Sequence, residues 1–351
     1  MTSDGVAHSG QLDLPRLTSL RWYAALVVFL FHNEGLLLGW RPLRAFFWGQ
    51  AGVAFFFILS GFVLTFSARP GLPAGVFFRN RFARIYPAHL VTLVVAGVAF
   101  WLIPGIGATG WLGLGACLVL LQAWGSGGYP VYAYNQPSWS LSCEAFFYAL
   151  FPLLHRRMRR ERCSRVVTIG LCGLVLGAVA TALLAFLGSG SDLAYNNPMV
   201  RLPEFVWGMA CALALGRGNI RRVPMYAGLI ALGAGVVASH GFPLFPLFDY
   251  LLIPGFTMII LSGAQADLRG QPGLLTHPVS VYLGRLSFCF YLTHLLASRL
   301  LTYSISTAPA MLIVTFIGSL LSAVVLHHFV ELPAQRLLRG NAAGTSVRGS
   351  N

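Results

Sequence analysis

Arg21 and His32 are the residues whose types and spacing most clearly suggest chemistry. His32 follows Arg21 by eleven residues in one apolar segment, which is about 16 Å and three turns of an α-helix. Three turns bring both side chains to nearly the same face. An imidazole can act as a general base near neutral pH, and a guanidinium binds anionic oxygens. The pair therefore suits a long substrate with an anionic head at one end and a reactive group at the other.

A second group of polar residues follows Pro137. Ser140, Ser142 and Glu144 alternate with apolar residues at the expected start of a helix, where serine side chains could cap the first turn. The same three side chains could also reach a cavity beside His32. In that cavity Glu144 would either orient the imidazole or act as the base itself.

Further ionisable residues fall inside apolar runs, where each costs about 2.5–3.5 kcal/mol on insertion scales. Glu34 and Asp249 lie close to the ends of predicted spans, so we expect their side chains to be exposed to water. Glu204 lies at a predicted helix start, where a carboxylate interacts favourably with the helix dipole. His294, in the segment YLTHLL, is interpreted either as an interhelical hydrogen-bonding group or as a supporting residue of the site.

The elements that carry these residues must be membrane helices. Hydrophobic residues make up 56% of the 351 residues, charged residues only 10%, and the mean hydropathy is +0.71. Soluble domains contain about 25% charged residues. All 24 basic residues are arginines, and the formal net charge is +14. The arginines cluster between apolar runs, as in membrane proteins, so nucleic acid is not an expected partner.

Ten apolar runs of roughly 17 to 25 residues predict about ten transmembrane helices. The runs are 22–40, 46–68, 85–103, 139–155, 166–187, 199–216, 223–239, 245–264, 286–303 and 308–330. The apolar segment 110–123 is too short to span, and we expect a re-entrant or interfacial helix there. The predicted fold class is an all-α integral membrane bundle, with residues 16–339 as one transmembrane domain between tails 1–15 and 340–351.

The arginine distribution also predicts the orientation of the chain. With the N-terminus in the cytoplasm, all but four of the 24 arginines fall on the inner side or at its boundary, as the positive-inside rule requires. The four exceptions are Arg41, Arg44, Arg201 and Arg299. The sequence therefore predicts a multi-pass inner-membrane protein with both termini in the cytoplasm.

The six cysteines lie mostly in apolar stretches and form no CxxC pattern. We interpret them as small buried hydrophobic residues. Neither a disulfide framework nor a metal site is expected from their spacing.

The order of these motifs resembles that of the membrane-bound acyltransferase family 3. The first span has the family's pattern of Arg, ten residues and His at Arg21 and His32, and RFARIYPAHL has its Arg-x-x-Arg pair at Arg81 and Arg84. The segment PSWSLSCEAFFYALFP is similar to the family signature Trp-Ser-Leu-Ser-x-Glu. The residues that match the signature are Trp139, Ser140, Leu141, Ser142 and Glu144, and Tyr148 follows them in the same segment. The segments GVAFFFILSGFVL, RLPEFVWGM, GRLSFCFYLTHLL and ELPAQRLLR complete the resemblance along the chain.

The resemblance implies transfer of an acyl group, most often acetyl, from acyl-CoA to a hydroxyl of a sugar, a glycan or a glycosylated natural product. His32 and Glu144 would be the catalytic residues. The cofactor phosphates would be bound by Arg21, Arg81 and Arg84. The supporting residues would be Ser140, Ser142, Trp139, Tyr148 and His294. No metal is expected, and direct transfer and a two-step path through an acyl-imidazole both remain open.

A polytopic transporter or flippase for a glycan or small molecule is the competing class. Ten spans with intramembrane His and Glu residues could equally line a substrate pathway. The sequence has no evident inverted repeat, and an arginine cluster beside a histidine-bearing span favours an enzyme. The identity of the acceptor, the length of the acyl chain and the oligomeric state are not indicated by the sequence.

Overall fold

The computed structural model describes residues 14–34, 49–69, 71–103, 110–125, 130–188, 191–240, 247–302 and 309–339. Within these ranges the chain forms α-helices joined by short turns, and no strand is present. The predicted fold class, an all-α multi-span membrane bundle, is confirmed. Residues 1–13 and 340–351, which make up nearly all of the two predicted tails, lie outside the described ranges.

Each of the ten predicted runs overlaps one long helix, although several helices, such as α1, α3 and α11, begin before the predicted run. These helices are α1 (Pro15–His32), α2 (Gly52–Phe66), α3 (Ala74–Leu102), α5 (Trp139–Met158), α6 (Cys163–Phe186), α8 (Pro198–Gly216), α9 (Met225–His240), α10 (Phe248–Leu268), α11 (Pro278–Thr302) and α12 (Pro309–Leu326). Seven described segments are long and apolar enough to cross a membrane, and they contain α2, α3, α6, α8, α10, α11 and α12. Helix α9 has only 16 residues, while α1 and α5 carry the polar residues of the predicted site.

Helix α4 (Trp111–Leu118) occupies the segment that was expected not to cross. Its eight residues span about 12 Å, whereas the hydrocarbon core is about 30 Å thick. A ring nitrogen of His89 on α3 lies 2.8 Å from the carbonyl oxygen of Cys117 and fastens α4 to α3. The prediction of one short additional helix is therefore confirmed.

Three helical segments were not predicted. Helix α7 (Ser191–Asn196) is too short to give a periodic signal. A π-helical turn (His327–Glu331) continues α12, and α13 (Leu332–Arg339) follows it without a break. The last predicted span therefore ended too early, because the polar residues after it still form helix.

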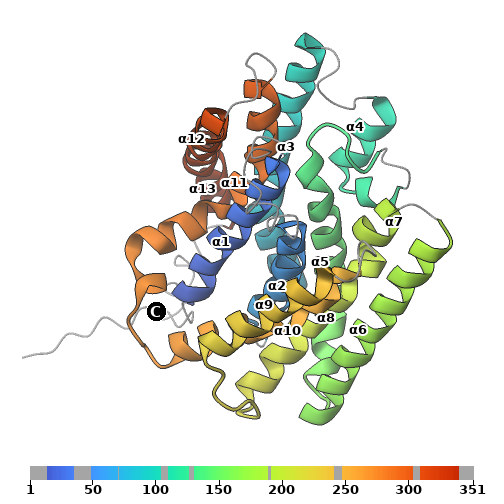
Figure 1. Cartoon of the computed structure of the whole chain (residues 1–351), viewed down its shortest axis with the longest axis vertical. Helices are drawn as coiled ribbons and strands as arrows, with labels where there is room; N and C mark the ends of the chain where they lie inside the picture. The colour runs from blue at the N-terminus through green and yellow to red at the C-terminus, as the bar shows by residue number, and fades with distance from the viewer. Residues whose placement is uncertain are drawn as a thin grey trace, which may run out of the picture.

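Helix α1 lies inside the bundle beside α11, while α6 flanks α8 on the opposite side (Figure 1). Near one end of α1, the Ser19 hydroxyl donates a 2.7 Å hydrogen bond to the carbonyl of Leu275, just before α11. At the other end, the Ser298 hydroxyl of α11 donates a 2.6 Å bond to the Asn33 side chain. The two helices therefore run side by side in the same direction.

The N-terminus of α1 is fixed by a carboxylate from α10. Asp267 accepts hydrogen bonds from the backbone nitrogen and from Nη1 of Arg16, both at 3.0 Å. A carboxylate at this position satisfies an unpaired backbone donor and interacts favourably with the helix dipole. Arg16 also donates a hydrogen bond to the carbonyl of Gln271. These contacts fix the position of α1 along its own axis relative to the end of α10.

Helices α2 and α8 pack backbone against backbone. A Cβ atom on Gly61 would collide with the carbonyl oxygen of Phe205, and one on Gly208 would collide with that of Ile58. Small residues at such crossings permit close helix packing in membranes. The contact holds α8 directly behind α2.

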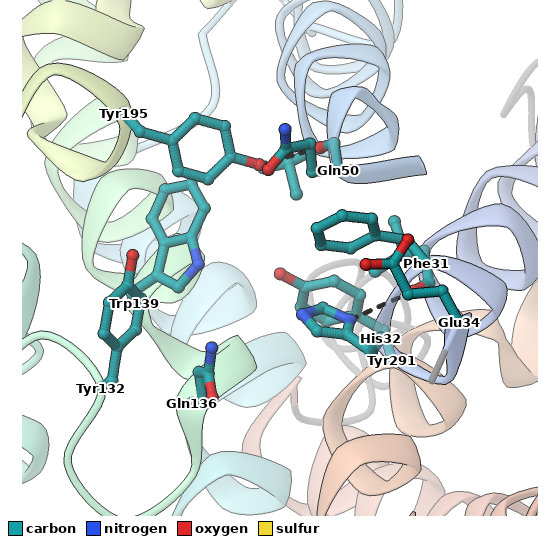
Figure 2. A pocket seen from close by; sticks show the side chains of 11 residues that line it. Phe31, His32, Glu34, Gln50, Tyr132, Gln136, Trp139, Tyr195 and Tyr291 are labelled. Carbon is teal, nitrogen blue, oxygen red and sulfur yellow. Dashed lines mark hydrogen bonds between the residues drawn. The ribbon is translucent and has the colours of Figure 1, made fainter. Parts of the chain in front are cut away.

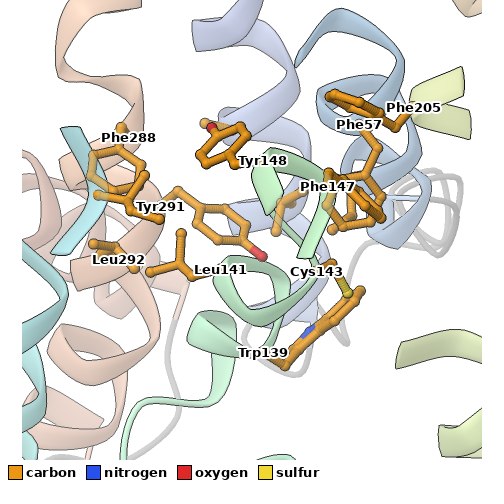
Figure 3. Packing of buried hydrophobic residues seen from close by; sticks show 14 of the residues in the cluster. Phe57, Trp139, Leu141, Cys143, Phe147, Tyr148, Phe205, Phe288, Tyr291 and Leu292 are labelled. Atoms are coloured by element: carbon orange, nitrogen blue, oxygen red, sulfur yellow. The ribbon is translucent and has the colours of Figure 1, made fainter. Parts of the chain in front are cut away.

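An aromatic core joins α2, α5 and α8 (Figure 3). The Phe57 ring lies edge-on to Trp139 at 6.2 Å and to Phe147 at 5.1 Å, and Phe147 stacks on Phe205 at 5.0 Å. Such ring pairs contribute about 0.5–1.5 kcal/mol beyond their buried area. The core therefore fixes the start of α5, which carries the predicted signature residues.

Arg201, Glu204 and Asp249 form a buried ion cluster between α8 and α10. Arg201 Nη1 lies 2.8 Å from Asp249 Oδ2 and 3.3 Å from Glu204 Oε1, and all three side chains are at most 2% exposed. The expectations of a water-exposed Asp249 and of a Glu204 held by the helix dipole are therefore wrong, whereas the predicted location of Arg201 on the outer side of the membrane stays a prediction. Inside the bundle each carboxylate compensates the charge of the arginine. Glu34, in contrast, is exposed as expected.

Candidate functional site

Two cavities lie along α1. The larger one, of about 390 Å³, contains His32 in its wall, and the smaller one, of about 30 Å³, contains Arg21. Val53 and Tyr291 line both cavities. A single helix therefore presents Arg21 to one cavity and His32 to the next, in agreement with the shared face expected from their spacing.

His32 is hydrogen-bonded to a second histidine. His294 Nε2 on α11 lies 3.0 Å from His32 Nδ1, and the ring centroids are 5.0 Å apart. The same His32 Nδ1 lies 3.1 Å from the carbonyl oxygen of Val28 (Figure 2). His294 Nδ1 in turn lies 2.6 Å from the carbonyl oxygen of Tyr291.

These contacts determine the tautomers of the two neutral rings. A carbonyl oxygen only accepts hydrogen bonds, so His294 Nδ1 carries the hydrogen and its Nε2 is the acceptor. His32 Nδ1 faces that acceptor and the Val28 carbonyl, so it must be the donor. The basic nitrogen of His32 is therefore Nε2.

Glu144 does not contact His32. It lines the small cavity with Arg21, and its carboxylate accepts a 2.8 Å hydrogen bond from the Tyr148 hydroxyl. The expectation that Glu144 orients the imidazole is therefore wrong. Sequence alternation placed Glu144 toward the cavities correctly, but the position that orients His32 is occupied by His294, 262 residues further along the chain.

The two signature serines do not cap α5, because no side-chain cap is present at its N-terminus. The Ser140 hydroxyl lies 3.0 Å from the Pro137 carbonyl and 3.0 Å from the Tyr291 hydroxyl, and Ser140 lines the small cavity. The Ser142 hydroxyl is buried and has no hydrogen-bond partner among the described residues. Ser140 therefore connects α5 to α11 at the level of the cavities.

The three predicted phosphate-binding arginines lie together. The charge of Arg21 interacts with those of Arg81, Arg84 and Glu144. Arg81 lies over the Tyr148 ring at 5.9 Å. Within the described part of the chain, the buried Nε atoms of Arg21 and Arg81 have no hydrogen-bond acceptor. Unsatisfied buried donors of this kind fit an anionic ligand.

Glu331, in the π-helical turn, holds Arg84 in this cluster. Its carboxylate forms an ion pair with Arg84 and accepts hydrogen bonds from His327 Nδ1 at 2.7 Å, Gln335 Nε2 at 2.9 Å and Cys289 Sγ at 3.1 Å. Helices α3, α11 and α13 thus meet at one buried carboxylate. The sequence contained a signal for Glu331, a carboxylate within ELPAQRLLR, but no sign that it faces Arg84.

Cys289, His327 and Glu331 are also the residues most suited to hold a metal ion in the described part of the chain, since their ligand atoms lie within 4.8 Å of one another. The hydrogen bonds among these side chains already satisfy the carboxylate. The group therefore functions as a connection between helices in this arrangement.

The large cavity is walled by rings and neutral amides. Its aromatic residues are Phe31, Tyr132, Trp139, Tyr195 and Tyr291 (Figure 2). Gln50 and Gln136 provide amides, and Glu34 provides a carboxylate. Among the lining residues, His32 and Trp139 were predicted as site residues, and His294, which is hydrogen-bonded to His32, was predicted as a supporting residue. Gln136 lies in the same segment as Trp139 and could have been found, whereas Tyr195 belongs to the unpredicted α7.

Comparison with known proteins extends this description. The family described as "Acyltransferase domain" matches residues 14–328. Acyltransferase MdmB of Streptomyces mycarofaciens is 33% identical over 93% of this chain and 92% of its own length. Exopolysaccharide production protein ExoZ of Rhizobium meliloti (strain 1021) is 25% identical over 86% of this chain and 94% of its own.

A third relative is the putative acetyltransferase ORF330 of Acidianus two-tailed virus, which is 24% identical over 82% of this chain and 84% of its own length. No solved structure matches the chain. The family match includes α1, α3, α5 and α11, which together carry both histidines and all three clustered arginines. The chain is therefore a multi-pass membrane protein that belongs to acyltransferase family 3, and it is an enzyme that transfers acyl groups.

Proposed function

We propose that the protein transfers an acyl group, most often acetyl, from acyl-CoA to a hydroxyl of a sugar, a glycan or a glycosylated natural product. One observation supports this more than any other. Helix α1 joins an arginine-lined cavity to a cavity with a hydrogen-bonded histidine pair, over a distance of about 16 Å between Arg21 and His32 along the axis. That distance matches the reach of an extended pantetheine arm.

Arg21, Arg81 and Arg84 would bind the phosphates of the donor. Guanidinium groups bind phosphate oxygens through paired, charge-assisted hydrogen bonds. The cluster contains three cations and two nearby carboxylates, Glu144 and Glu331, so an anion would balance its charge. The unpartnered Nε atoms of Arg21 and Arg81 provide donors for it.

His32 would act as the general base. Its Nε2 would take the proton of the acceptor hydroxyl as the hydroxyl oxygen attacks the thioester carbonyl. The carbon–sulfur bond breaks as the carbon–oxygen bond forms, and the proton passes from His32 to the departing thiolate. His294 would hold the tautomer of His32 that this step requires.

Attack by His32 Nε2 on the thioester is the two-step alternative, which would produce an acyl-imidazole before the acceptor reacts. Incubating the protein with labelled acetyl-CoA in the absence of acceptor separates the two paths, since only the second one labels the protein. Glu144 would serve the donor side in both paths, because it lies in the small cavity with Arg21.

The large cavity would bind the acceptor. Sugar rings present apolar faces to aromatic side chains and hydroxyls to amides and carboxylates, and binding pockets generally combine apolar walls with a few oriented polar groups. Trp139, Tyr195, Gln50 and Gln136 provide that combination around His32. One relative is an exopolysaccharide production protein, which supports the proposal of a carbohydrate acceptor.

The donor would enter from the cytoplasm. The arginine-rich ends of the helices include Arg81 and Arg84 near the start of α3, and cytoplasmic faces carry the excess of basic residues. In this orientation the His32 end of α1 would face the outer side of the inner membrane, and both termini would lie in the cytoplasm.

The test uses the purified protein in lipid nanodiscs, with acetyl-CoA as donor and a panel of glycosides and oligosaccharides as acceptors. We expect release of free CoA and, in equal amount, an acetyl ester on one class of acceptor detected by mass spectrometry. Nanodiscs without the protein are the control. Ester formation with a different acyl carrier but not with acetyl-CoA would contradict the donor, and CoA release without any ester would contradict the acceptor class.

A further inference from the structure

Val53 and Tyr291 stand between the two cavities. They are the only described residues that line both, Val53 from α2 and Tyr291 from α11. Both side chains are buried, with 4% and 7% exposure. The two side chains therefore form part of the boundary between the Arg21 cavity and the His32 cavity.

Tyr291 is held firmly in this position. Its hydroxyl lies 3.0 Å from the Ser140 hydroxyl and 3.1 Å from the carbonyl oxygen of Pro137. Its ring lies edge-on to Phe56, with centroids 5.9 Å apart. Tyr291 is therefore held by α2, by α5 and by the 3₁₀ turn Gln136–Ser138 that precedes α5.

Val53 has equally little freedom. At the preceding residue, Gly52, a Cβ atom would lie 2.8 Å from Val28 Cγ2 on α1, so the two helices are in close contact at this level. The β-branched side chain of valine has few accessible rotamers. The isopropyl group of Val53 is thus held in place at the boundary that it shares with the ring of Tyr291.

We propose that Val53 and Tyr291 form a neck through which the acyl group reaches His32, and that Val53 makes the enzyme selective for unbranched acyl groups. The inference rests on the proposed acyl-CoA donor. The small cavity, at about 30 Å³, has room for about two water-sized groups. A slender chain can enter such a space, while a branch at the carbon next to the carbonyl would collide with Val53.

The test compares affinities and needs no knowledge of the acceptor. Free CoA, acetyl-CoA, propionyl-CoA and isobutyryl-CoA are titrated against the wild-type protein and against Val53→Ala, Val53→Ile and Val63→Ala in nanodiscs. Val63 lies on the same helix and lines neither cavity, so its variant controls for loss of a valine from α2.

We expect the wild-type protein to bind acetyl-CoA and propionyl-CoA about tenfold or more tightly than isobutyryl-CoA, as overpacking costs predict. Val53→Ala should reduce this ratio to about one, Val53→Ile should increase it, and Val63→Ala should leave it unchanged. Affinity for free CoA, which has no acyl group, should be the same in all four proteins. This constant affinity also shows that the variants are folded.

Equal acetyl-to-isobutyryl ratios in wild type and in both Val53 variants, with free CoA still bound, would overturn the neck while leaving the donor proposal intact. Failure of the wild-type protein to bind any of the four ligands would overturn the donor proposal, and the neck with it.

Discussion

The two cavities share a wall but differ in chemistry. The small cavity combines the charged groups Arg21 and Glu144 with apolar walls, whereas the large one combines neutral amides, rings, an imidazole and the carboxylate of Glu34. Helices α1, α2, α5 and α11 contribute to both. The groups suited to a charged carrier and those suited to a neutral acceptor therefore lie at different positions along the same helices, and not in separate domains.

Because of this difference, the kinetic effect of a substitution should depend on which of the two cavities it changes. Changes in the large cavity should alter catalysis or acceptor binding and leave donor affinity intact. Changes around the small cavity should do the reverse. The four predictions below test that separation.

His32→Ala should have the largest effect. Removal of a general base costs about 10²–10⁴-fold in rate, while the affinity for acyl-CoA should stay within about twofold of wild type because the phosphates bind elsewhere. Single-turnover transfer and donor titration measure the two quantities. His277→Ala, at a histidine that lines neither cavity, is the matched control. A parallel loss of donor affinity would show that the cavities are not separate.

His294→Ala should lower the rate by about 10- to 100-fold, as expected when a reacting group is misplaced by a fraction of an ångström to an ångström. His294→Gln should recover part of the loss, because an amide oxygen can accept from His32 Nδ1 while its nitrogen donates to the Tyr291 carbonyl. The acetyl-CoA affinity should not change. Equal activity of the Ala and Gln variants would argue against an orienting hydrogen bond.

Arg84→Ala should weaken acyl-CoA binding by about tenfold to a hundredfold, the range for loss of a charge-assisted hydrogen bond. The maximal rate at saturating donor should be largely retained. Arg269→Ala, at an exposed arginine just after α10, controls for loss of one positive charge. An unchanged affinity in Arg84→Ala would remove this arginine from the donor site.

Trp139→Ala should have the smallest effect, raising the KM for the acceptor by about two- to tenfold, in line with the strength of single aromatic contacts. The KM for acetyl-CoA should remain constant. Steady-state kinetics with each substrate varied in turn measure both values. A rise confined to the donor KM would reverse the assignment of the large cavity.

The elements of the fold were predictable where length and hydrophobicity act locally. Each long apolar run formed a helix, because a membrane helix satisfies its own backbone hydrogen bonds. The α7 helix and the π-helical turn were missed since six and five residues are too few for a periodic pattern. The shared helix face of Arg21 and His32 was predictable for the same reason, since both residues belong to one helix.

The partners of the site residues were not predictable, because they depend on which helices become neighbours. His294 reaches His32 only through the parallel packing of α1 and α11. Glu144 was assigned to His32 on alternation alone, which determines a helix face but not a depth in the bundle. Arg201 and Asp249 were likewise placed near the ends of two separate predicted spans, and their pairing in the folded bundle was not predicted.

The buried ion cluster has a consequence for how the chain enters the membrane during synthesis. Helix α8 brings Arg201 into the bilayer with Glu204 one turn away, while Asp249 follows 48 residues later in the chain. At about 5–20 residues per second, the ribosome needs roughly 2 to 10 seconds to deliver that second carboxylate. During this interval Arg201 relies on Glu204 alone, at a distance of 3.3 Å. We therefore expect α8 to reach its final buried position only after α10 has been inserted.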